Sequence, residues 1–163
     1  MSYTPIKVEL LEVVGLSHSF EAMRLPVEQR SSKKNDWNLA ATLIKAGSDH
    51  AKFQRGILAY IKIEMQTGFM IEFETYRHGI EVLSTSSSMH NELKHLRGEE
   101  LAAQKQRDLQ TKVYTRILTM SYQSLRAIYR ARKIHRHPDW ILFTNFIELL
   151  PYFTDLIYPE YGV

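Results

Sequence analysis

The chain has 163 residues, of which 44% are hydrophobic and 24% are charged, and these proportions are ordinary for a soluble globular protein. Cysteine is absent, which excludes disulfides, thiolate metal ligands and cysteine nucleophiles and fits a cytoplasmic protein. No apolar run approaches the roughly 20 residues of a membrane span, and the first residues lack a signal-peptide pattern, so we expect no membrane partner. The length suits one domain over residues 1–163 with its own core.

The first part of the chain predicts two strands separated by helices. Alternating, β-branched residues over residues 6–14 predict a strand. A short helix follows and stops near Pro26, and a polar loop then leads to a helix that is capped by Asp36 and ended by Gly47. Apolar residues alternate again over residues 57–65, and this is the clearest strand pattern in the sequence.

The remainder of the chain predicts mostly helix. One helix begins near Thr67, and the Ser/Thr run after it predicts a loop. From Ser88 the sequence is rich in Glu, Lys, Arg and Leu and again predicts helix, with interruptions at Gly98 and near Ser121. A last helix is predicted to start at Pro138. Two or three early strands and long late helices predict an α+β fold, in which a small antiparallel or mixed sheet packs against the helices.

Positive charge gathers in one block of an otherwise mildly basic chain. The formal net charge is +3, and residues 126–137 hold four Arg, one Lys and two His with no acid. Such a block suits a phosphate-bearing partner, either a nucleotide or a nucleic acid, for which Tyr122 and Tyr129 would be stacking groups. A solvated helix end is the alternative, because cations favour the C-terminal end of a helix dipole. The cationic neighbours of the two histidines disfavour a divalent ion, so we expect no metal.

An Arg-His pair carries the most information in the sequence. Arg77 and His78 follow an aromatic residue, Tyr76, and are followed by Gly79, seven further residues and Ser87. This segment resembles the hallmark of the flavin-dependent thymidylate synthases, which reads Arg-His-Arg, seven residues, Ser. The flanking matches are His50 and Phe53 ahead of a predicted strand, Ser124 and Leu125 six residues before Arg132, and then His137 and Trp140. The resemblance in order and spacing covers most of the chain.

The resemblance implies a homotetramer whose FAD and dUMP sites are built from several subunits. Methylenetetrahydrofolate would donate the carbon, NADPH would reduce the flavin, and dTMP would be the product. Carried over position by position, His50, Arg77 and His78 would bind the flavin cofactor, and Ser87 would lie at the nucleotide. Arg132 would hold the pyrimidine and favour charge on its ring, so that Arg132 and Ser87 are the candidate catalytic residues. A guanidinium suits this role because its fork binds a planar imide or a phosphate bidentately.

The sequence also departs from the family. Gly79 stands in place of the third Arg of the hallmark, and Gln123 in place of an Arg before the Ser-Leu pair. Phe73 and Glu74 replace an Arg-Gln pair, and an acid beside a diphosphate is unfavourable. The last family motif, Gln-x-Glu-Ile, has no counterpart in "PDWILF". A site with fewer such contacts is expected to use another substrate or to have lost the reaction.

The register of the Ser-rich segment has two alternatives. In one, the family's Gly-Arg-Tyr after the Ser corresponds to residues 88–90, which makes Ser88 a substrate-binding candidate beside Ser87. In the other, an insertion follows Gly79 and the family's Asn-Glu-Leu corresponds to residues 91–93, which moves Arg97 toward the phosphate-binding role. Both registers stay open.

Each candidate also has a purely structural interpretation. His50 can cap a helix, the Arg77-His78 pair can close the preceding helix through its dipole, and Arg132 can be a solvated helix residue. The Ser/Thr run can be a simple connection.

The sequence therefore leaves three functions open. The first is a flavin-dependent thymidylate synthase-like protein that binds FAD and dUMP, with methylation of dUMP retained, altered or lost. The second is a non-catalytic nucleotide-binding or protein-interaction module of the same fold, as in a viral or phage protein, and the third is a nucleic-acid-binding protein. In the first, we expect Arg77, His78 and Arg132 to converge across touching subunits around an anionic nucleotide.

Overall fold

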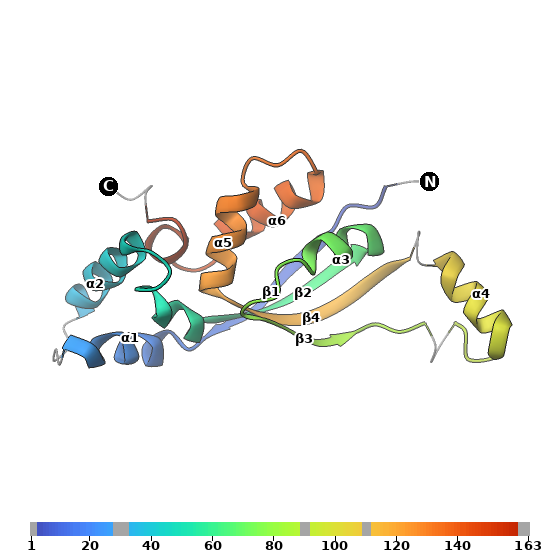
Figure 1. Cartoon of the computed structure of the whole chain (residues 1–163), viewed down its shortest axis with the longest axis horizontal. Coiled ribbons are helices and arrows are strands. Elements are labelled where there is room, and N and C mark those ends of the chain that lie inside the picture. The colour runs from blue at the N-terminus through green and yellow to red at the C-terminus, as the bar shows by residue number, and fades with distance from the viewer. Residues whose placement is uncertain (1–2, 28–32, 89–91, 109–111, 160–163) are drawn as a thin grey trace.

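A computed structural model describes residues 3–27, 33–88, 92–108 and 112–159 of the chain. Its elements are β1 (Lys7–Val14), α1 (Leu16–Arg24), the short helix η1 (Leu25–Val27), α2 (Lys33–Ala46), the short helix η2 (Lys52–Gly56), β2 (Leu58–Gln66), α3 (Thr67–Phe73), β3 (Ile80–Thr85), α4 (Gly98–Asp108), β4 (Val113–Ser121), α5 (Tyr122–Arg132), α6 (Pro138–Glu148) and the π-helical turn η3 (Phe153–Ile157) (Figure 1).

Four antiparallel strands form one sheet in the order β1-β2-β4-β3. The two central strands, β2 and β4, pair without interruption from Leu58 opposite Ser121 to Gln66 opposite Val113. Alternate residues of β2 point to one face, where Ile61 and Ile63 are fully buried. The α+β class predicted from the sequence is therefore confirmed, and so is its strand over residues 57–65.

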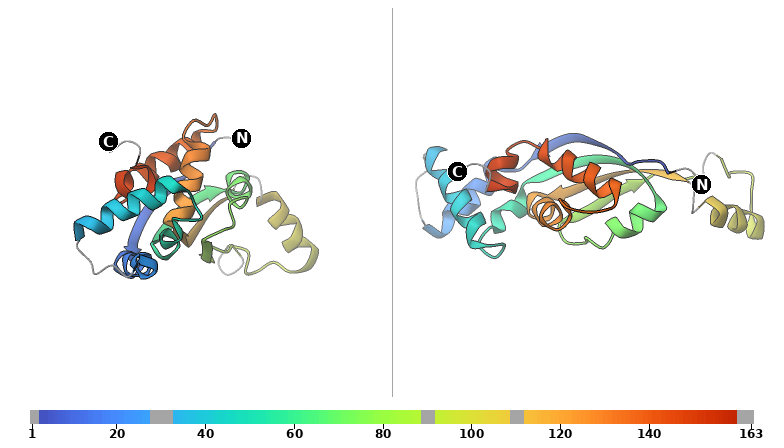
Figure 2. Two further views of the ribbon diagram at one scale, coloured as in Figure 1. Left: turned by 60° about the vertical axis from the view of Figure 1, so that its left-hand side comes forward. Right: turned by 90° about the horizontal axis from the view of Figure 1, so that it is seen from above.

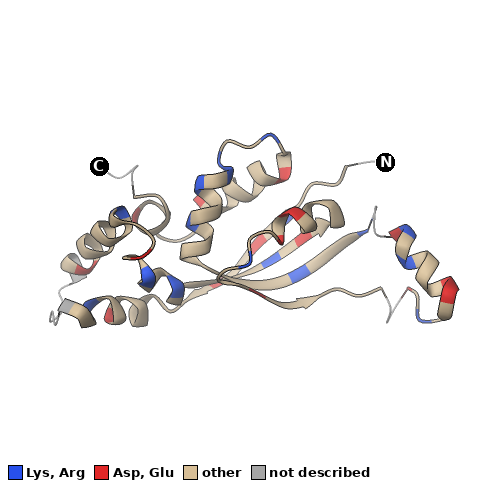
Figure 3. Ribbon diagram, viewed as in Figure 1, with Lys and Arg blue, Asp and Glu red and all other residues tan. Residues whose placement is uncertain are grey.

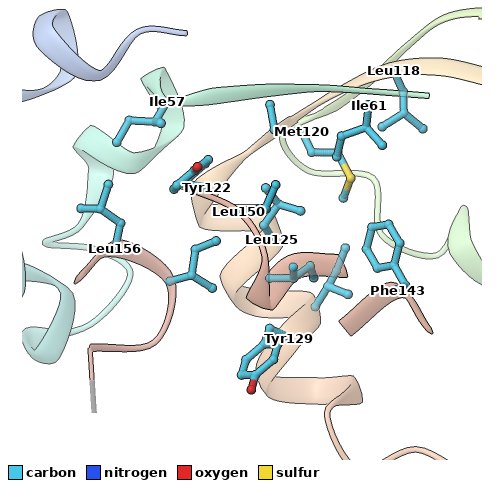
Figure 4. Close-up of a cluster of buried hydrophobic side chains, with 14 of the residues drawn as sticks. Ile57, Ile61, Leu118, Met120, Tyr122, Leu125, Tyr129, Phe143, Leu150 and Leu156 are labelled. Carbon is cyan, nitrogen blue, oxygen red and sulfur yellow. The ribbon is translucent and has the colours of Figure 1, made fainter. Parts of the chain in front are cut away.

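Helices α3, α5 and α6 cover one face of the sheet (Figures 1 and 2). Figure 4 shows how Ile61, Leu118 and Met120 from the strands lie near Leu125 and Phe143 from the helices. A cluster of rings extends this core, because Trp140 of α6 is fully buried with its ring centroid 4.8 Å from that of Phe69 on α3. Burying such a side chain contributes on the order of 2–3 kcal/mol.

The opposite face of the sheet carries cross-strand ion pairs instead of a helix layer. Lys62 lies 3.6 Å from Glu9, and Lys7 lies 3.4 Å from Glu64. The two edge strands, β1 and β3, each contain a register shift in their pairing. In β1 the shift lies between Leu10 and Glu12, and in β3 it lies between Val82 and Ser84.

Two strands were not predicted. β3 occupies the start of the segment predicted as a loop, and its residues are mostly exposed and show no regular alternation of apolar and polar side chains. β4 lies within the segment predicted as helix between the interruptions at Gly98 and near Ser121, and Arg116 and the threonines obscure its alternation. Three helices of 11 residues each, α4, α5 and α6, occupy the later part of the chain, and β4 separates the first two. The interruption predicted near Ser121 is real, because this residue caps α5 by accepting from Ser124 N–H.

The helix predicted to begin at Asp36 begins earlier, at Lys33. Asp36 is in its first turn and binds Arg24, with 2.7 Å between Oδ2 and Nη1. Gly47 follows the helix with a φ of 116°, as the prediction of a terminal glycine requires. The polar loop was predicted over residues 28–36, and this is wrong for its last four residues, because Lys33–Asp36 already belong to α2. Residues 28–32 lie outside the described residues. In the described part of the chain, every helix is too short or too polar for a membrane crossing.

Candidate functional site

A cleft of about 710 Å³ lies between η2, the segment that joins α3 to β3, and the first turns of α5. Its wall combines apolar surface from Leu58 and Ala127 with the ring of Tyr76 and several hydroxyl groups. The charged groups that line it are Arg55, Arg77, His78 and Glu81. Two guanidinium groups against one carboxylate leave the cleft positive when the histidine is neutral, which favours an anionic ligand.

Arg77 and His78, the pair that the sequence predicts to bind the flavin, both line this cleft and are exposed to solvent. The Nε atom of Arg77 donates to the carbonyl of Glu74 at 3.3 Å, so this side chain also closes the end of α3. Within the described residues, Nη1 and Nη2 of Arg77 have no hydrogen-bond partner. The structural and the binding interpretations of Arg77 are therefore compatible.

The backbone of this segment is attached to the start of α5. Ser121 N–H donates to the Gly79 carbonyl at 2.8 Å, and the Ser124 hydroxyl donates to the His78 carbonyl. Gly79 has a φ of +68°, and a Cβ built on it would lie 2.5 Å from both serine hydroxyl oxygens. A side chain at Gly79 would therefore be strained in conformation and would require the two serines to shift, which disfavours the third Arg of the hallmark at this position.

Arg55 is a lining residue that the sequence analysis missed. Its Nε donates to Gln123 Oε1 at 2.8 Å, and Gln123 Nε2 donates to the Ser48 carbonyl at 2.9 Å. Arg55 stands two residues after Phe53, which belongs to the element matched to the family, and that position was the available signal. Its partner is 68 residues away along the chain, and no local pattern reveals such a contact.

Arg132 does not line the cleft but packs behind Tyr76, which does. Its guanidinium carbon lies 4.7 Å from the Trp140 ring centroid and 5.5 Å from that of Tyr76. Nε donates to the Tyr76 hydroxyl at 2.7 Å, and Nη1 lies 2.9 Å from His135 Nε2. These contacts fix the side chain between aromatic rings and join it to the cleft through Tyr76.

His50 lies in a second hollow of about 510 Å³, with Asp49, Lys52 and Phe53 and with apolar side chains of α1 and α2. This hollow is lined by a different set of residues from the cleft. The structure therefore does not bring His50 together with the Arg77-His78 pair within one chain.

The Ser-rich segment forms a third hollow of about 550 Å³ at the α4 end of the molecule, away from α5 (Figure 1). Ser87 is exposed there and Ser88 is buried, and Lys105 of α4 lines the same hollow. Arg97 is exposed nearby in the chain, and its Nη1 donates to the carbonyls of Lys94 at 2.6 Å and Leu96 at 2.7 Å. Residues 89–91, on which both alternative registers depend, lie outside the described residues.

The basic block over residues 126–137 does not form a continuous stacking surface. Tyr122 and Tyr129, named above as stacking groups, are 0% and 4% exposed. Burial raises the pKa of Tyr122, whose hydroxyl donates to the Pro151 carbonyl at 2.8 Å. Arg126 is also buried and donates to the Ile44 carbonyl at 2.9 Å. In Figure 3, Lys and Arg colour both η2 and α5, the elements that flank the cleft.

In the part of the chain that the structure describes, no three His, Asp or Glu side chains are grouped so that they could hold a metal ion.

The sequence matches no family model and no curated protein. The fold matches two crystal structures of the flavin-dependent thymidylate synthase ThyX from Helicobacter pylori, each with FAD and dUMP. One has a TM-score of 0.69 over 95% of this chain and 98% of that chain, and the other has 0.71 over 94% and 98%. Both are 14% identical to this chain. At this identity the likeness shows the fold, which is the α+β fold of these enzymes.

Proposed function

We propose that this chain is a nucleotide-binding protein with the fold of the flavin-dependent thymidylate synthases, and that its cleft binds FAD. The observation that carries the proposal is the Arg77-His78 pair, which lines the cleft on a segment held rigid by α5. Structures of the same fold contain FAD and dUMP. A cofactor site on a fixed backbone binds at a lower entropic cost than one on a mobile loop.

The residues of the cleft fit the chemical groups of a flavin dinucleotide. Guanidinium groups bind phosphate oxygens bidentately, and Arg77 presents both terminal nitrogens for this. Tyr76, Leu58 and Ala127 offer ring and apolar surface for a flat heterocycle. FAD would supply the hydride chemistry, while the protein residues would orient it and neutralise its phosphates.

A dUMP-like nucleotide would be held by the second group of predicted residues, Ser87, Ser88 and Arg97. These lie at the α4 end of the chain, away from the cleft (Figure 1). A site that combines them with Arg77 and His78 therefore requires more than one copy of the chain, and we propose a homo-oligomer, with a tetramer as its expected form. His50 and Arg132 would reach such a shared site from neighbouring copies, and these roles stay predictions.

Catalysis of dUMP methylation is a separate and more specific proposal than nucleotide binding. Methylation of dUMP would require NADPH and methylenetetrahydrofolate, and several contacts of the family are replaced in this chain. Each lost contact to a charged group in a buried site weakens binding by about 1–3 kcal/mol. These replacements favour a protein that acts on a different substrate or whose activity has degenerated.

The absorbance spectrum of the untreated purified protein tests the proposal first. Bound FAD would give the yellow flavin absorbance, and added FAD or dUMP would raise the melting temperature of the protein. A colourless protein whose melting temperature responds to neither ligand would contradict the proposal and favour a non-catalytic interaction module. Sedimentation at micromolar concentration tests the shared site, which a strict monomer would exclude. Formation of dTMP from dUMP with both cosubstrates measures catalysis.

A further inference from the structure

Two guanidinium groups in the cleft share a feature that distinguishes them from ordinary surface arginines. Arg55 comes from η2 and Arg77 from the segment after α3, and each has its Nε tied to a protein acceptor. Within the described part of the chain, the terminal nitrogens of both have no hydrogen-bond partner. Each fork is therefore oriented at its base and open at its tip, which is the arrangement for bidentate binding of an oxyanion.

We infer that Arg55 and Arg77 form a two-arginine clamp for a diphosphate group, and that Gln123 is the positioning residue of Arg55. The inference rests on the proposed function, which it deepens by naming the part of the ligand that Arg55 binds. Gln123 accepts from Arg55 Nε and donates to the Ser48 carbonyl, so its amide orientation is fixed from both ends. An arginine held in this way loses less rotamer freedom when the anion binds.

The geometry around Gly79 explains why the second arginine comes from η2. The backbone conformation and the two serine hydroxyls disfavour a side chain at Gly79, directly beside His78. The position of the family's third Arg therefore supplies no cation here, and Arg55 of η2 is a lining residue that carries a positive charge. Gln123 is neutral, so it orients Arg55 without cancelling its charge, whereas Glu81 in the same cleft offsets part of the positive potential.

Binding of inorganic pyrophosphate, followed by calorimetry or ³¹P NMR at low ionic strength, tests the clamp without a flavin. The wild type is expected to bind saturably, and affinity is expected to fall as salt rises, because both arginines are exposed. Arg55→Ala is expected to weaken binding about tenfold, as the loss of a charge-assisted bond requires. Arg55→Lys, which keeps the charge and loses the fork, should lie between the two.

Arg136→Ala is the matched control. Arg136 is exposed in the connection between α5 and α6, outside the cleft, so its loss removes the same charge and should change affinity less than twofold. Gln123→Ala should weaken pyrophosphate binding several-fold while leaving the melting temperature unchanged, because it releases Arg55 without disturbing the fold. An Arg55→Lys affinity between those of the wild type and Arg55→Ala would show that the orientation of the guanidinium matters in addition to its charge. Equal affinities of Arg55→Ala and Arg136→Ala, or a wild type that does not bind pyrophosphate, would overturn the clamp.

A parallel titration with FAD separates this inference from the proposed function. If the wild type binds pyrophosphate through Arg55 but does not bind FAD, the proposed cofactor is wrong and the two-arginine clamp still holds. If FAD binds equally well to Arg55→Ala and pyrophosphate does not compete with it, the proposed cofactor still holds and the clamp is wrong.

Discussion

The contact of Gly79 with the start of α5 gives a sharp prediction. In Gly79→Ala the added Cβ would lie 2.5 Å from the hydroxyl oxygens of Ser121 and Ser124, a separation that real Cβ atoms do not show. The φ of +68° is also strained for any L-residue with a side chain. The serines must move, and with them the bonds to the carbonyls of His78 and Gly79.

The expected loss of stability combines two contributions. The left-handed conformation costs about 1–2 kcal/mol, and the two disturbed hydrogen bonds, one donated by the Ser124 hydroxyl and one by the Ser121 backbone N–H, cost about 1 kcal/mol each. The sum is about 3–4 kcal/mol, which in a domain of this size lowers the melting temperature by about 6–16 °C.

Urea unfolding followed by circular dichroism measures this loss, with Gly68→Ala as the matched control. Gly68 lies in α3, and a Cβ built there meets nothing within 4 Å, so alanine should be neutral or stabilise the protein by up to about 1 kcal/mol. If the free energies of unfolding of the two variants agree within about 0.5 kcal/mol at equal m-values, the inference that this segment is held by α5 is wrong.

Three further predictions concern single side chains. Arg132→Ala should lower the free energy of unfolding by about 1–2 kcal/mol, because its guanidinium packs on the buried Trp140 ring; urea unfolding checks this. Burial raises the pKa of Tyr122, so the folded state keeps a proton that the unfolded state releases above about pH 10, and stability should fall there by up to about 1.4 kcal/mol per pH unit. Tyr122→Phe should flatten that fall in a pH series of melts. Gln123→Glu should weaken pyrophosphate binding about tenfold, because a carboxylate beside Arg55 competes with the anion; calorimetry measures this.

The strands that could be predicted from the sequence are those in which burial of one face makes apolar and polar residues alternate. In β2 one face is buried by the helices, so its apolar residues alternate and the strand can be recognised. β4 is equally central, yet Arg116 lies among its residues and pairs with Glu74 at 2.7 Å, a partner that no local pattern reveals. β3 is an exposed edge strand, whose position depends on pairing with β4 and not on its own composition.

The same limit applies to the candidate site. Arg77 and His78 could be identified because they are adjacent and stand in a recognisable motif. The placement of Arg55 depends on Gln123, and that of Arg132 on Tyr76, which is 56 residues away. Such long-range contacts arise from tertiary packing, so residue spacing alone could not tell a lining arginine from one packed between rings.

The irregular pairing of β1 and β3 has a consequence for how copies of this chain can assemble. An uninterrupted outer strand offers evenly spaced amides to any strand that approaches, whereas a local extra residue twists the strand and breaks that spacing. Both borders of this sheet carry such an extra residue, at Leu11 on one side and Leu83 on the other. Lateral growth into one continuous intermolecular sheet is thereby disfavoured, and in the proposed homo-oligomer the copies would meet through their faces and helices.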